Sequence, residues 1–247
     1  MLNSSHQVRD QTLSQIKSNI ELMVATNGGN KAVIVPHSMG SIYFLHFMKW
    51  VEAPAPMGGG GGPDWCAKHI KAVMNIGGPF LGVPKALAAL FSAEAREIAV
   101  ARVGIPTERA YLYRQTSIAQ CHIPFQIETS ADEGNEGCLK NGVFTVDGDE
   151  AVSILSAGFM CAKGWRGRTR FNPSGIKTYL REYDHAPPAN LLEGRGTQSG
   201  AHVDIMGNFA LIEDIMRVAA GATGKGLGGG QVHSDILKWS QKINLRI

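Results

Sequence analysis

Residues 31–51 read KAVIVPHSMGSIYFLHFMKWV, and this stretch carries the strongest signal for the fold. The β-branched run from Lys31 to Pro36 has the pattern of a short, fully buried strand. The residues after Gly40 are apolar on nearly every side, as in a buried helix. Ser38 falls at the break between the two patterns. The sequence therefore predicts a sharp strand-to-helix turn that lifts a serine clear of the sheet edge, which is the arrangement of a nucleophile elbow.

The spacing around Ser38 fits such an elbow only in part. Strand and helix crowd each other at the turn, so small residues normally stand two positions before and after the serine. Gly40 satisfies this rule, whereas Pro36 occupies the earlier position in place of glycine. The positive end of the following helix points toward developing oxyanion charge, and the backbone N–H of Met39 is the expected oxyanion-hole donor.

A serine hydroxyl is a poor nucleophile without a base, so the turn needs an acid and a histidine as partners. In α/β-hydrolase folds the three residues follow one another along the chain as serine, acid and histidine. The string VFTVDGDE, residues 143–150, places Asp147 at the end of a predicted strand and Asp149 in the turn beyond it. Either aspartate is a candidate acid, and the D-G-D cluster is equally compatible with a solvated turn.

Three histidines follow the candidate acids. His202 lies in the small-residue loop GTQSGAHVDIM, which runs into a predicted helix. It is the preferred base, because a catalytic imidazole must reach the serine from a loop at the edge of the sheet. His185 directly follows a predicted strand and is the second candidate, and His233 comes late, near a helix start. His37 adjoins the serine, and we expect it to pack or hydrogen-bond, because neighbouring side chains in an elbow diverge.

The rest of the chain alternates between strand and helix patterns. Predicted strands cover residues 70–76, 124–129, 143–146 and 177–183, and predicted helices cover residues 8–26, 85–101, 205–220 and 234–243, the last with Ser234 as its N-cap. This alternation predicts an α/β fold with a mostly parallel sheet flanked by helices. The glycine-rich segment 54–65 lacks the Lys-Ser/Thr of a phosphate-binding loop and is expected to be a flexible surface linker.

Composition narrows the range of partners. The chain has 247 residues and a formal net charge of +3 without a long basic run, so nucleic acid is not an expected partner. This mild basicity does not oppose contact with an anionic membrane surface. No stretch approaches the ~18–20 apolar residues of a membrane-spanning helix, and residues 1–10 lack the apolar core of a signal peptide, so the chain is expected to be soluble on its own. Cys66 and His69 have a C-x-x-H spacing without a second ligand pair, and no metal site is expected.

Several long and unusual strings run along the chain. They are PHSMGSIYFLHFMKWVEAP from residue 36, WCAKHIKAVMNIGGPFLGVPK from 65, GIPTERAY from 104, VDGDE from 146, SAGFMCAKGWRGRTRFNPSG from 156 and NLLEGRGTQSGAHVDIMGN from 190. Through these strings, which together cover most of its length, the chain resembles the lecithin:cholesterol acyltransferase family, and within it the plant-type phospholipid:diacylglycerol acyltransferases.

The resemblance implies an α/β-hydrolase fold and a specific chemistry. By position in the family's motifs, Ser38 matches the nucleophile, Asp149 the acid and His202 the histidine. Enzymes of this family take an acyl chain from a phospholipid, hold it on the serine and pass it to a lipid hydroxyl; the plant type uses diacylglycerol and makes triacylglycerol. The resemblance implies that no cofactor and no metal are needed, and that the protein acts at the endoplasmic reticulum membrane.

Compared with the family, residues 1–247 are expected to form a single partial α/β-hydrolase domain. We expect the chain to start at the helix before the elbow strand, without a counterpart of the family's membrane anchor or of the loop with the second oxyanion donor. A central region with lid and acceptor-binding elements is also expected to be missing, with the apparent join near residues 102–104. Ala151 and Ser153 stand where the family pattern tends to have threonine and proline.

Three functions are compatible with the sequence. The first is an O-acyltransferase that works through Ser38. The second is a lipase-like or phospholipase-like hydrolase, in which water replaces the acceptor alcohol because the acceptor-binding region is missing. The third is a non-catalytic fragment that binds lipid or a full-length relative.

Overall fold

The computed structural model describes residues 3–86, 105–115, 125–134, 137–186, 188 and 196–244, with side chains for all of these except 3–10, 115 and 125. The chain forms two compact units, residues 1–78 with 215–222 and residues 79–214 with 223–247. Beyond residue 86, the helix predicted over 85–101 lies outside the described residues, and so does the apparent join at 102–104.

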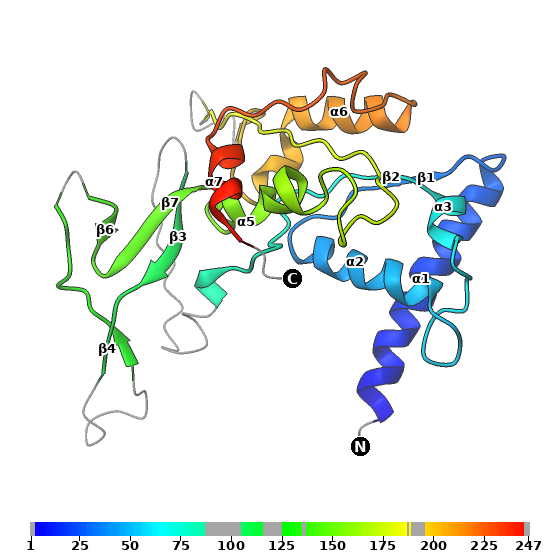
Figure 1. Ribbon diagram of the computed structural model, residues 1–247, viewed down its shortest axis with the longest axis horizontal. Helices are drawn as coiled ribbons and strands as arrows, with labels where there is room; N and C mark the ends of the chain where they lie inside the picture. The colour runs from blue at the N-terminus through cyan, green and yellow to red at the C-terminus, as the bar shows by residue number, and fades with distance from the viewer. Residues whose placement is uncertain are drawn as a thin grey trace. The chain divides into compact units, whose positions relative to one another are not determined.

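The first unit contains the strand, turn and helix predicted from residues 31–51 (Figure 1). Its elements are α1 (Asn3–Thr26), β1 (Ala32–Ile34), α2 (Met39–Glu52), α3 (Trp65–His69) and β2 (Ile70–Val73). β1 and β2 pair in parallel, and a further parallel bridge joins His37 to Ile76 beyond the ends of both strands. The predictions of both strands, of the helix after the serine and of the first helix are confirmed, but β1 is half-buried and not fully buried as expected.

The core of the first unit is built on α2. Phe47 is fully buried, with the ring of Phe44 stacked on it at 5.3 Å between centroids and the ring of Trp65 edge-on at 5.6 Å. The Trp65 indole N–H donates to the Glu21 carboxylate at 2.7 Å, which ties α3 to α1. Burial of an apolar or aromatic side chain contributes about 1.5–3 kcal/mol, so this cluster stabilises the helix that begins at the serine turn. Its other buried members are Leu13, Ile20 and Val51.

The structure differs from the expected flexible linker at residues 54–65. This segment folds back onto the C-terminal end of α2, where the Gly59 N–H donates to the Trp50 carbonyl at 2.7 Å. Lys17 on α1 donates to the Gly59 carbonyl at 2.9 Å. A Cβ on Gly59 would lie 2.7 Å from the Trp50 ring and 2.9 Å from the Val51 Cα atom. Glycine is needed here because the backbone approaches the helix closely.

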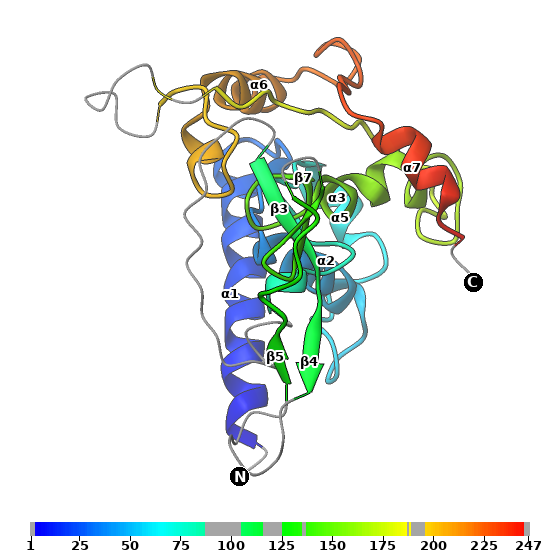
Figure 2. The same cartoon turned by 90° about the vertical axis from the view of Figure 1, so that its left-hand side faces the viewer.

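The second unit combines small antiparallel sheets with short helices (Figure 2). The strands are β3 (Ile105–Tyr111), β7 (Val143–Gly148) and β6 (Leu139–Lys140) in one sheet, and β4 (Tyr113–Gln115) and β5 (Phe125–Ile127) in another. The helices are α5 (Ile154–Phe159), a π-helix over Met160–Gly164, a 3-10 turn over Asp204–Gly207, the first part of α6 (Phe209–Ala219), and α7 (Ile236–Lys242). α5 and α7 pack closely, since a Cβ on Gly158 would lie 3.3 Å from Ile236. The predicted strands 124–129 and 143–146 are confirmed as β5 and β7.

The expected mostly parallel sheet is found only in part, because β1 and β2 are the one parallel pair among the described strands. In the second unit, β6 and β7 are joined by Asn141 and Gly142, with positive φ angles of 49° and 76°. A two-residue Asn-Gly loop with this backbone makes a tight hairpin, whose strands run antiparallel. β3 lies antiparallel on the other side of β7, so the strand that leads to Asp149 is paired on both sides.

The helix predicted over residues 205–220 is divided into two pieces. Asn208 is buried between the 3-10 turn and α6, and its Oδ1 atom accepts the N–H groups of Ala210 and Leu211 at 3.0 and 3.3 Å. A side chain in this role is an N-cap, which starts a new helix rather than continuing the previous one. The residues just after His202 therefore form a separate short turn.

Two further elements differ from prediction. The segment 177–183 is extended but is paired, among the described residues, through a single bridge between Arg181 and Gln231. Asp235 occupies the N-cap position of α7 without a side-chain cap hydrogen bond, whereas the Ser234 hydroxyl accepts the Ile236 N–H at 3.2 Å. None of the described helices combines the length and the hydropathy that crossing a membrane requires.

We expect Gly59→Ala to lower the free energy of unfolding by about 1–3 kcal/mol, because the added methyl group must displace the Trp50 ring or the α2 backbone. Gly207→Ala is the matched control, since a Cβ there meets nothing within 4 Å. Urea unfolding followed by circular dichroism measures both variants. Wild-type stability of Gly59→Ala would mean that segment 54–65 behaves as the flexible linker after all.

Candidate active site

Ser38 stands on a strained turn between β1 and α2. Its backbone angles are φ 54° and ψ −129°, a combination that residues with a Cβ rarely adopt. Holding a residue in such a conformation costs about 1–3 kcal/mol, and the strain persists only where the surrounding structure fixes it. The observed turn is the sharp strand-to-helix bend that the sequence predicts.

Hydrogen bonds to the neighbouring strand hold this turn in place. The Ser38 N–H donates to the Ile76 carbonyl at 2.8 Å, and the Ile76 N–H donates to the Pro36 carbonyl at 3.0 Å. The hydroxyl of the fully buried Ser41 also donates to the Pro36 carbonyl, at 3.3 Å. Proline is compatible with this network because the network uses its carbonyl oxygen and not the N–H that proline lacks.

Met39 and Gly40 form the first turn of α2. A Cβ on Gly40 would lie 3.9 Å from the Pro36 Cβ, which is an ordinary van der Waals distance. The expected crowding at this position therefore leaves room for a methyl group. The Gly40 N–H donates back to the His37 carbonyl at 2.9 Å. The Met39 N–H is the first amide of the helix, for which the helix itself provides no acceptor, and such amides bind anions.

In the second unit, Asp149 and His202 are joined by a direct hydrogen bond. The Nδ1 atom of His202 and the Oδ2 atom of Asp149 are 2.8 Å apart, and the two side chains are only 14% and 17% exposed. The backbone N–H of His202 also donates to the Asp149 carbonyl at 2.7 Å, which fixes the histidine on the turn that carries the acid. Because the carboxylate accepts the Nδ1 proton, the lone pair of the neutral imidazole lies on Nε2.

The Asp149 carboxylate is itself held by the backbone. Its Oδ1 atom accepts the N–H groups of Ala151 and Val152 at 3.1 and 2.7 Å, which leaves Oδ2 for the imidazole. The hydrogen bond from Asp149 raises the pKa of His202, the negative charges of Asp149 and Glu150 add to this, and burial acts against it. Protonation of His202 therefore stabilises the fold below the ordinary histidine pKa of about 6.5, and this contribution is lost as the pH rises through the raised pKa.

The other candidate histidines have different partners. His185 accepts the Gly200 N–H on its Nδ1 atom at 3.0 Å. The Nδ1 atom of His233 lies 2.8 Å from the Asp184 carboxylate, in a pair that is mostly exposed. Of the three histidines that follow the candidate acids, His202 is the one that the structure brings onto the D-G-D turn.

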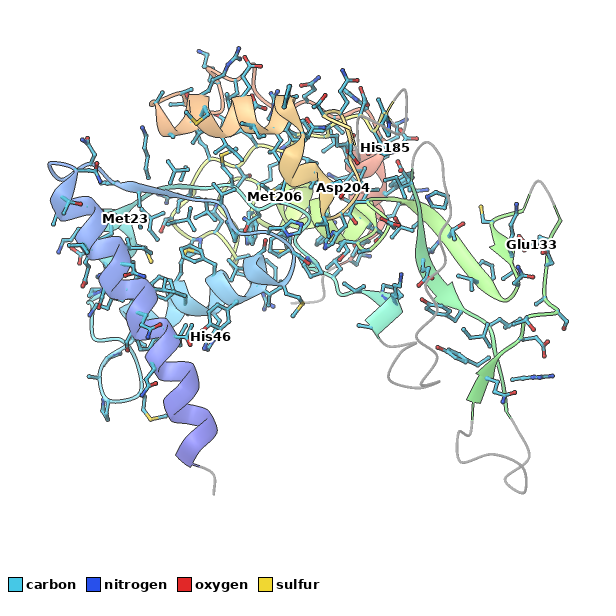
Figure 3. The ribbon with its side chains drawn as sticks, turned by 180° about the vertical axis from the view of Figure 1, so that it is seen from behind. Met23, His46, Glu133, His185, Asp204 and Met206 are labelled. Carbon is cyan, nitrogen blue, oxygen red and sulfur yellow. The ribbon has the colours of Figure 1, made fainter. Side chains whose placement is uncertain are left out.

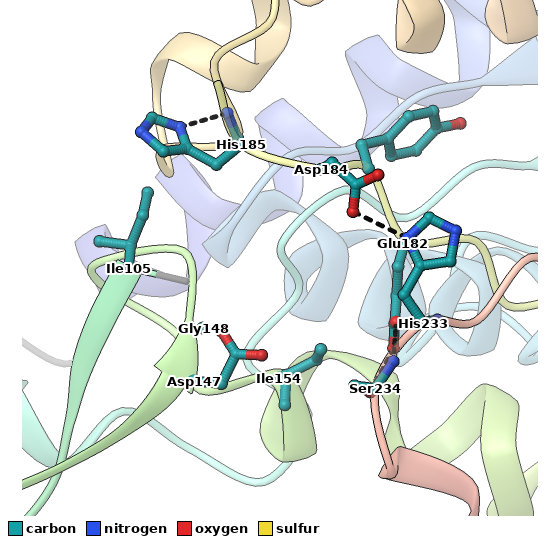
Figure 4. A pocket seen from close by; sticks show the side chains of 11 residues that line it. Ile105, Asp147, Gly148, Ile154, Glu182, Asp184, His185, His233 and Ser234 are labelled. Carbon is teal, nitrogen blue, oxygen red and sulfur yellow. Dashed lines mark hydrogen bonds and ion pairs between the residues drawn. The ribbon is translucent and has the colours of Figure 1, made fainter. Parts of the chain in front are cut away.

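A cavity of about 450 Å³ lies in the second unit (Figure 4), and residues close in sequence to Asp149 and His202 form part of its wall. Gly148, directly before the acid, and Gly200, two residues before the histidine, line this cavity. The second candidate acid, Asp147, lines it as well. The Glu182 carboxylate on its wall accepts the N–H and the hydroxyl of Ser234 at 2.8 and 2.6 Å, so it joins the 177–186 segment to the start of α7.

No group of three or more histidine, cysteine, aspartate or glutamate side chains in the described part of the chain is placed to hold a metal ion. Sequence reasoning missed one residue that contacts the acid turn. The hydroxyl of Thr107 on β3 accepts the Glu150 N–H at 2.9 Å, across 43 positions of sequence. No local pattern marks such a contact, because it arises from the pairing of β3 with β7.

The serine turn and the acid–histidine pair contain the kinds of group that acyl transfer uses. The first unit supplies a serine on a strained bend followed by a helix amide, and the second supplies an imidazole that a carboxylate orients. A nucleophile, a base and an oxyanion donor are the groups that acyl transfer through a serine ester needs.

Comparison with known proteins gives a match to the lecithin:cholesterol acyltransferase family over residues 3–102 and 99–209. Phospholipid:diacylglycerol acyltransferase 1 of Arabidopsis thaliana is 41% identical over 449 residues, which cover 98% of this chain and 67% of that protein. Putative phospholipid:diacylglycerol acyltransferase 2 of the same plant is 34% identical over 461 residues, covering 98% and 69%. The phospholipid:diacylglycerol acyltransferase of Schizosaccharomyces pombe is 35% identical over 352 residues, covering 86% and 54%. No solved structure matches the chain.

The alignments are longer than the chain itself. The alignment to the first Arabidopsis protein runs over 449 positions, whereas this chain has 247 residues, so that protein has residues within the matched region that are absent here. The two family matches overlap at residues 99–102. The join near residues 102–104 stays a prediction, and both observations are compatible with it.

We expect Ser38→Gly to be more stable than Ser38→Ala by about 1 kcal/mol, because glycine adopts the positive φ angle without a Cβ clash. Both substitutions remove the hydroxyl, so their difference isolates the backbone strain. At Ser14, on the exposed side of α1, the order should reverse, since glycine costs a helix about 1 kcal/mol relative to alanine. Urea unfolding of the four variants measures these differences. If the alanine variant is the more stable one at position 38 as well as at position 14, the turn stores no strain.

Proposed function

Because this chain belongs to the lecithin:cholesterol acyltransferase family, we propose that it transfers an acyl chain from a phospholipid to diacylglycerol and so forms triacylglycerol. Two relatives named for phospholipid:diacylglycerol acyl transfer match nearly the whole chain. At the level of residues, the proposal is carried by the 2.8 Å hydrogen bond between Asp149 and His202. This bond supports His202 as a base, because it orients the imidazole and leaves Nε2 to accept a proton.

In the first half of the proposed reaction, the Nε2 atom of His202 takes the proton of the Ser38 hydroxyl as the serine oxygen attacks the ester carbonyl of the phospholipid. The Met39 N–H stabilises the oxyanion that develops, and losing one such donor typically costs about 3–4 kcal/mol. The intermediate then breaks its bond to the glycerol oxygen. That oxygen takes the proton from His202 and leaves as a lysophospholipid, and the acyl chain remains as an ester of Ser38.

In the second half, the hydroxyl of diacylglycerol takes the place of the lysophospholipid. His202 accepts its proton as the oxygen attacks the acyl-serine carbonyl. When the serine ester breaks, the same proton returns to the Ser38 oxygen and triacylglycerol leaves. Asp149 stays ionised throughout and stabilises the imidazolium. The scheme balances its protons without a cofactor or a metal.

We infer further that residues 1–247 form a partial α/β-hydrolase domain, in which β1 and β2 belong to a mostly parallel sheet. The parallel pairing of these strands and the strand-to-helix turn at Ser38 support this inference. It is also supported by the residues that the longest-matching relatives have within the aligned region and this chain lacks. The endoplasmic reticulum membrane is the location we propose, on the family resemblance alone.

An apolar stripe follows His202 in the sequence and supports contact with a membrane surface; its member Met206 is labelled in Figure 3. The stripe's residues are spaced three apart in the sequence, from the residue directly before the 3-10 turn to the first part of α6. Its members are Val203, Met206, Phe209 and Ile212, which are exposed by 65%, 41%, 66% and 39%. Exposed apolar side chains close together in the sequence favour insertion into the boundary between lipid headgroups and acyl chains. Because the stripe begins beside the proposed base, docking through it brings that base to the level of the lipid esters.

We expect the purified chain to convert acyl-labelled phosphatidylcholine and diacylglycerol in mixed vesicles to labelled triacylglycerol, and Ser38→Ala to abolish the product. Because the pKa of His202 is raised and the neutral imidazole is the base, the rate should rise with pH through a value above about 6.5. Asp149→Asn should lower the rate by several orders of magnitude, whereas Asp147→Asn, the matched control, should leave it nearly unchanged. Chromatography of the lipid products measures all of these.

The products also separate the alternatives. Free fatty acid in place of triacylglycerol would assign the chain to the hydrolases. If a fluorophosphonate fails to label wild-type Ser38 and Asp149→Asn changes nothing, the non-catalytic fragment is correct and the enzymatic proposal is wrong.

We expect Phe209→Ser to weaken binding to phosphatidylcholine–diacylglycerol vesicles by about tenfold, because it removes the burial of one large apolar side chain. Met57→Ser is the control, since Met57 is 89% exposed on the glycine-rich segment and lies outside the stripe. Co-sedimentation with vesicles measures binding, and fluorophosphonate labelling in detergent-free buffer shows whether the site is intact. Equal loss of binding in both variants would mean that the stripe is not the membrane contact.

A further inference from the structure

The turn that presents Asp149 to His202 rests against one buried hydroxyl group. Thr107, in the middle of β3, is fully buried. Its hydroxyl donates to the Ile105 carbonyl at 3.0 Å and accepts the Glu150 N–H at 2.9 Å. A hydroxyl has a single proton, and here that proton is used on Ile105. An oxygen lone pair therefore faces the amide of the residue directly after Asp149.

Both neighbours of Asp149 are in contact with this hydroxyl. A Cβ on Gly148 would lie 2.4 Å from Oγ1 of Thr107 and 2.6 Å from the Val152 carbonyl oxygen, so the backbone of the turn lies directly against the threonine. Glu150 has a φ angle of 86°, and a residue with a Cβ holds such a conformation at a cost of about 1–3 kcal/mol. The hydrogen bond to Thr107 offsets part of this cost and fixes the Glu150 amide.

We propose that Thr107 is a positioning residue that holds Asp149 in hydrogen-bonding register with His202. It acts through the backbone of Gly148 and Glu150 and touches no reacting atom. The carboxylate contacts of Asp149 require the turn to keep its shape, and a misplacement of about 1 Å in a catalytic group can cost a hundredfold in rate. The inference rests on the proposed function for its effect on rate, but the register itself can be measured without any reaction.

The alignment of Asp149 with His202 can be followed by measuring the pKa of His202. The negative charges of Asp149 and Glu150 act on His202, and both residues belong to the turn that Thr107 supports. Both raise the pKa of His202. A turn that moves away therefore lowers the pKa of His202 toward the ordinary value of about 6.5. A merely structural role for Thr107, such as filling space in the sheet, would leave this pKa in place.

Three substitutions of Thr107 in the full chain test the proposal. Thr107→Ser keeps the hydroxyl, Thr107→Cys replaces it with a weak acceptor of similar size, and Thr107→Val removes it at nearly constant volume. The pKa of His202 is measured by NMR titration of its ring protons, assigned with His202→Ala. The rate of Ser38 labelling by a fluorophosphonate is measured across the same pH range. Thr145→Val, four residues before Asp149 on β7, is the matched control.

We expect Thr107→Ser and Thr145→Val to match wild type in both measurements. Thr107→Val should lower the pKa of His202 and slow the labelling roughly 10–100-fold, with Thr107→Cys in between. A wild-type titration of His202 in Thr107→Val overturns the proposal, and so does a Thr107→Ser protein that behaves like Thr107→Val. If Thr107→Val does not fold, Thr107→Cys decides by the same criterion. If wild-type Ser38 is not labelled, the proposed function fails, and the titration of His202 still decides on Thr107.

Discussion

The contact on which the candidate site depends is the hydrogen bond from Nδ1 of His202 to Oδ2 of Asp149. It sets the tautomer of the neutral imidazole and its orientation, and it raises the pKa of His202, because a nearby carboxylate favours the protonated ring. A carboxylate can hold an imidazole only if it is held itself, and the amides of Ala151 and Val152 do this through its other oxygen. Ala151 contributes only its backbone N–H to this arrangement, so its departure from the family's threonine leaves the contact intact.

Backbone strain lies close to the same chemistry. Among the described residues other than glycine, positive φ angles occur at Ser38, Asn141 and Glu150. Asn141 belongs to a hairpin loop, where this backbone is normal. Ser38 is the proposed nucleophile, and Glu150 directly follows the proposed acid. Such strained residues persist only where several contacts fix the backbone; the backbone of Ile76 contributes to this at Ser38, and the Thr107 hydroxyl does so at Glu150. A strained backbone at or directly beside a proposed catalytic residue is the common feature of both turns.

Local patterns predicted the fold well where the signal is local. A β-branched run followed by an apolar helical pattern was enough to predict β1, the turn at Ser38 and α2. Both elements produce a recognisable pattern of apolar residues along a short stretch of sequence. The same reasoning predicted parallel pairing too widely, since the Asn141-Gly142 loop was not used as a hairpin signal. The same reasoning took the glycines of segment 54–65 as a sign of a flexible linker. In the structure, glycine is needed at position 59 because the Trp50 ring leaves no room for a Cβ. The atoms that pack against a glycine cannot be inferred from the residues next to it in the sequence.

The sequence by itself determined the bend at Ser38, and it predicted the order of serine, acid and histidine and, through the family motifs, the choice of Asp149 and His202. Without those motifs, Asp147 and His185 remained open alternatives. Only the tertiary structure showed which aspartate binds which histidine, because residues 149 and 202 are 53 positions apart and meet through the D-G-D turn and the loop before α6. It alone revealed Thr107, which reaches that turn through the pairing of β3 with β7. Backbone preferences act over a few neighbouring residues, whereas a hydrogen bond between distant residues exists only after the chain has folded.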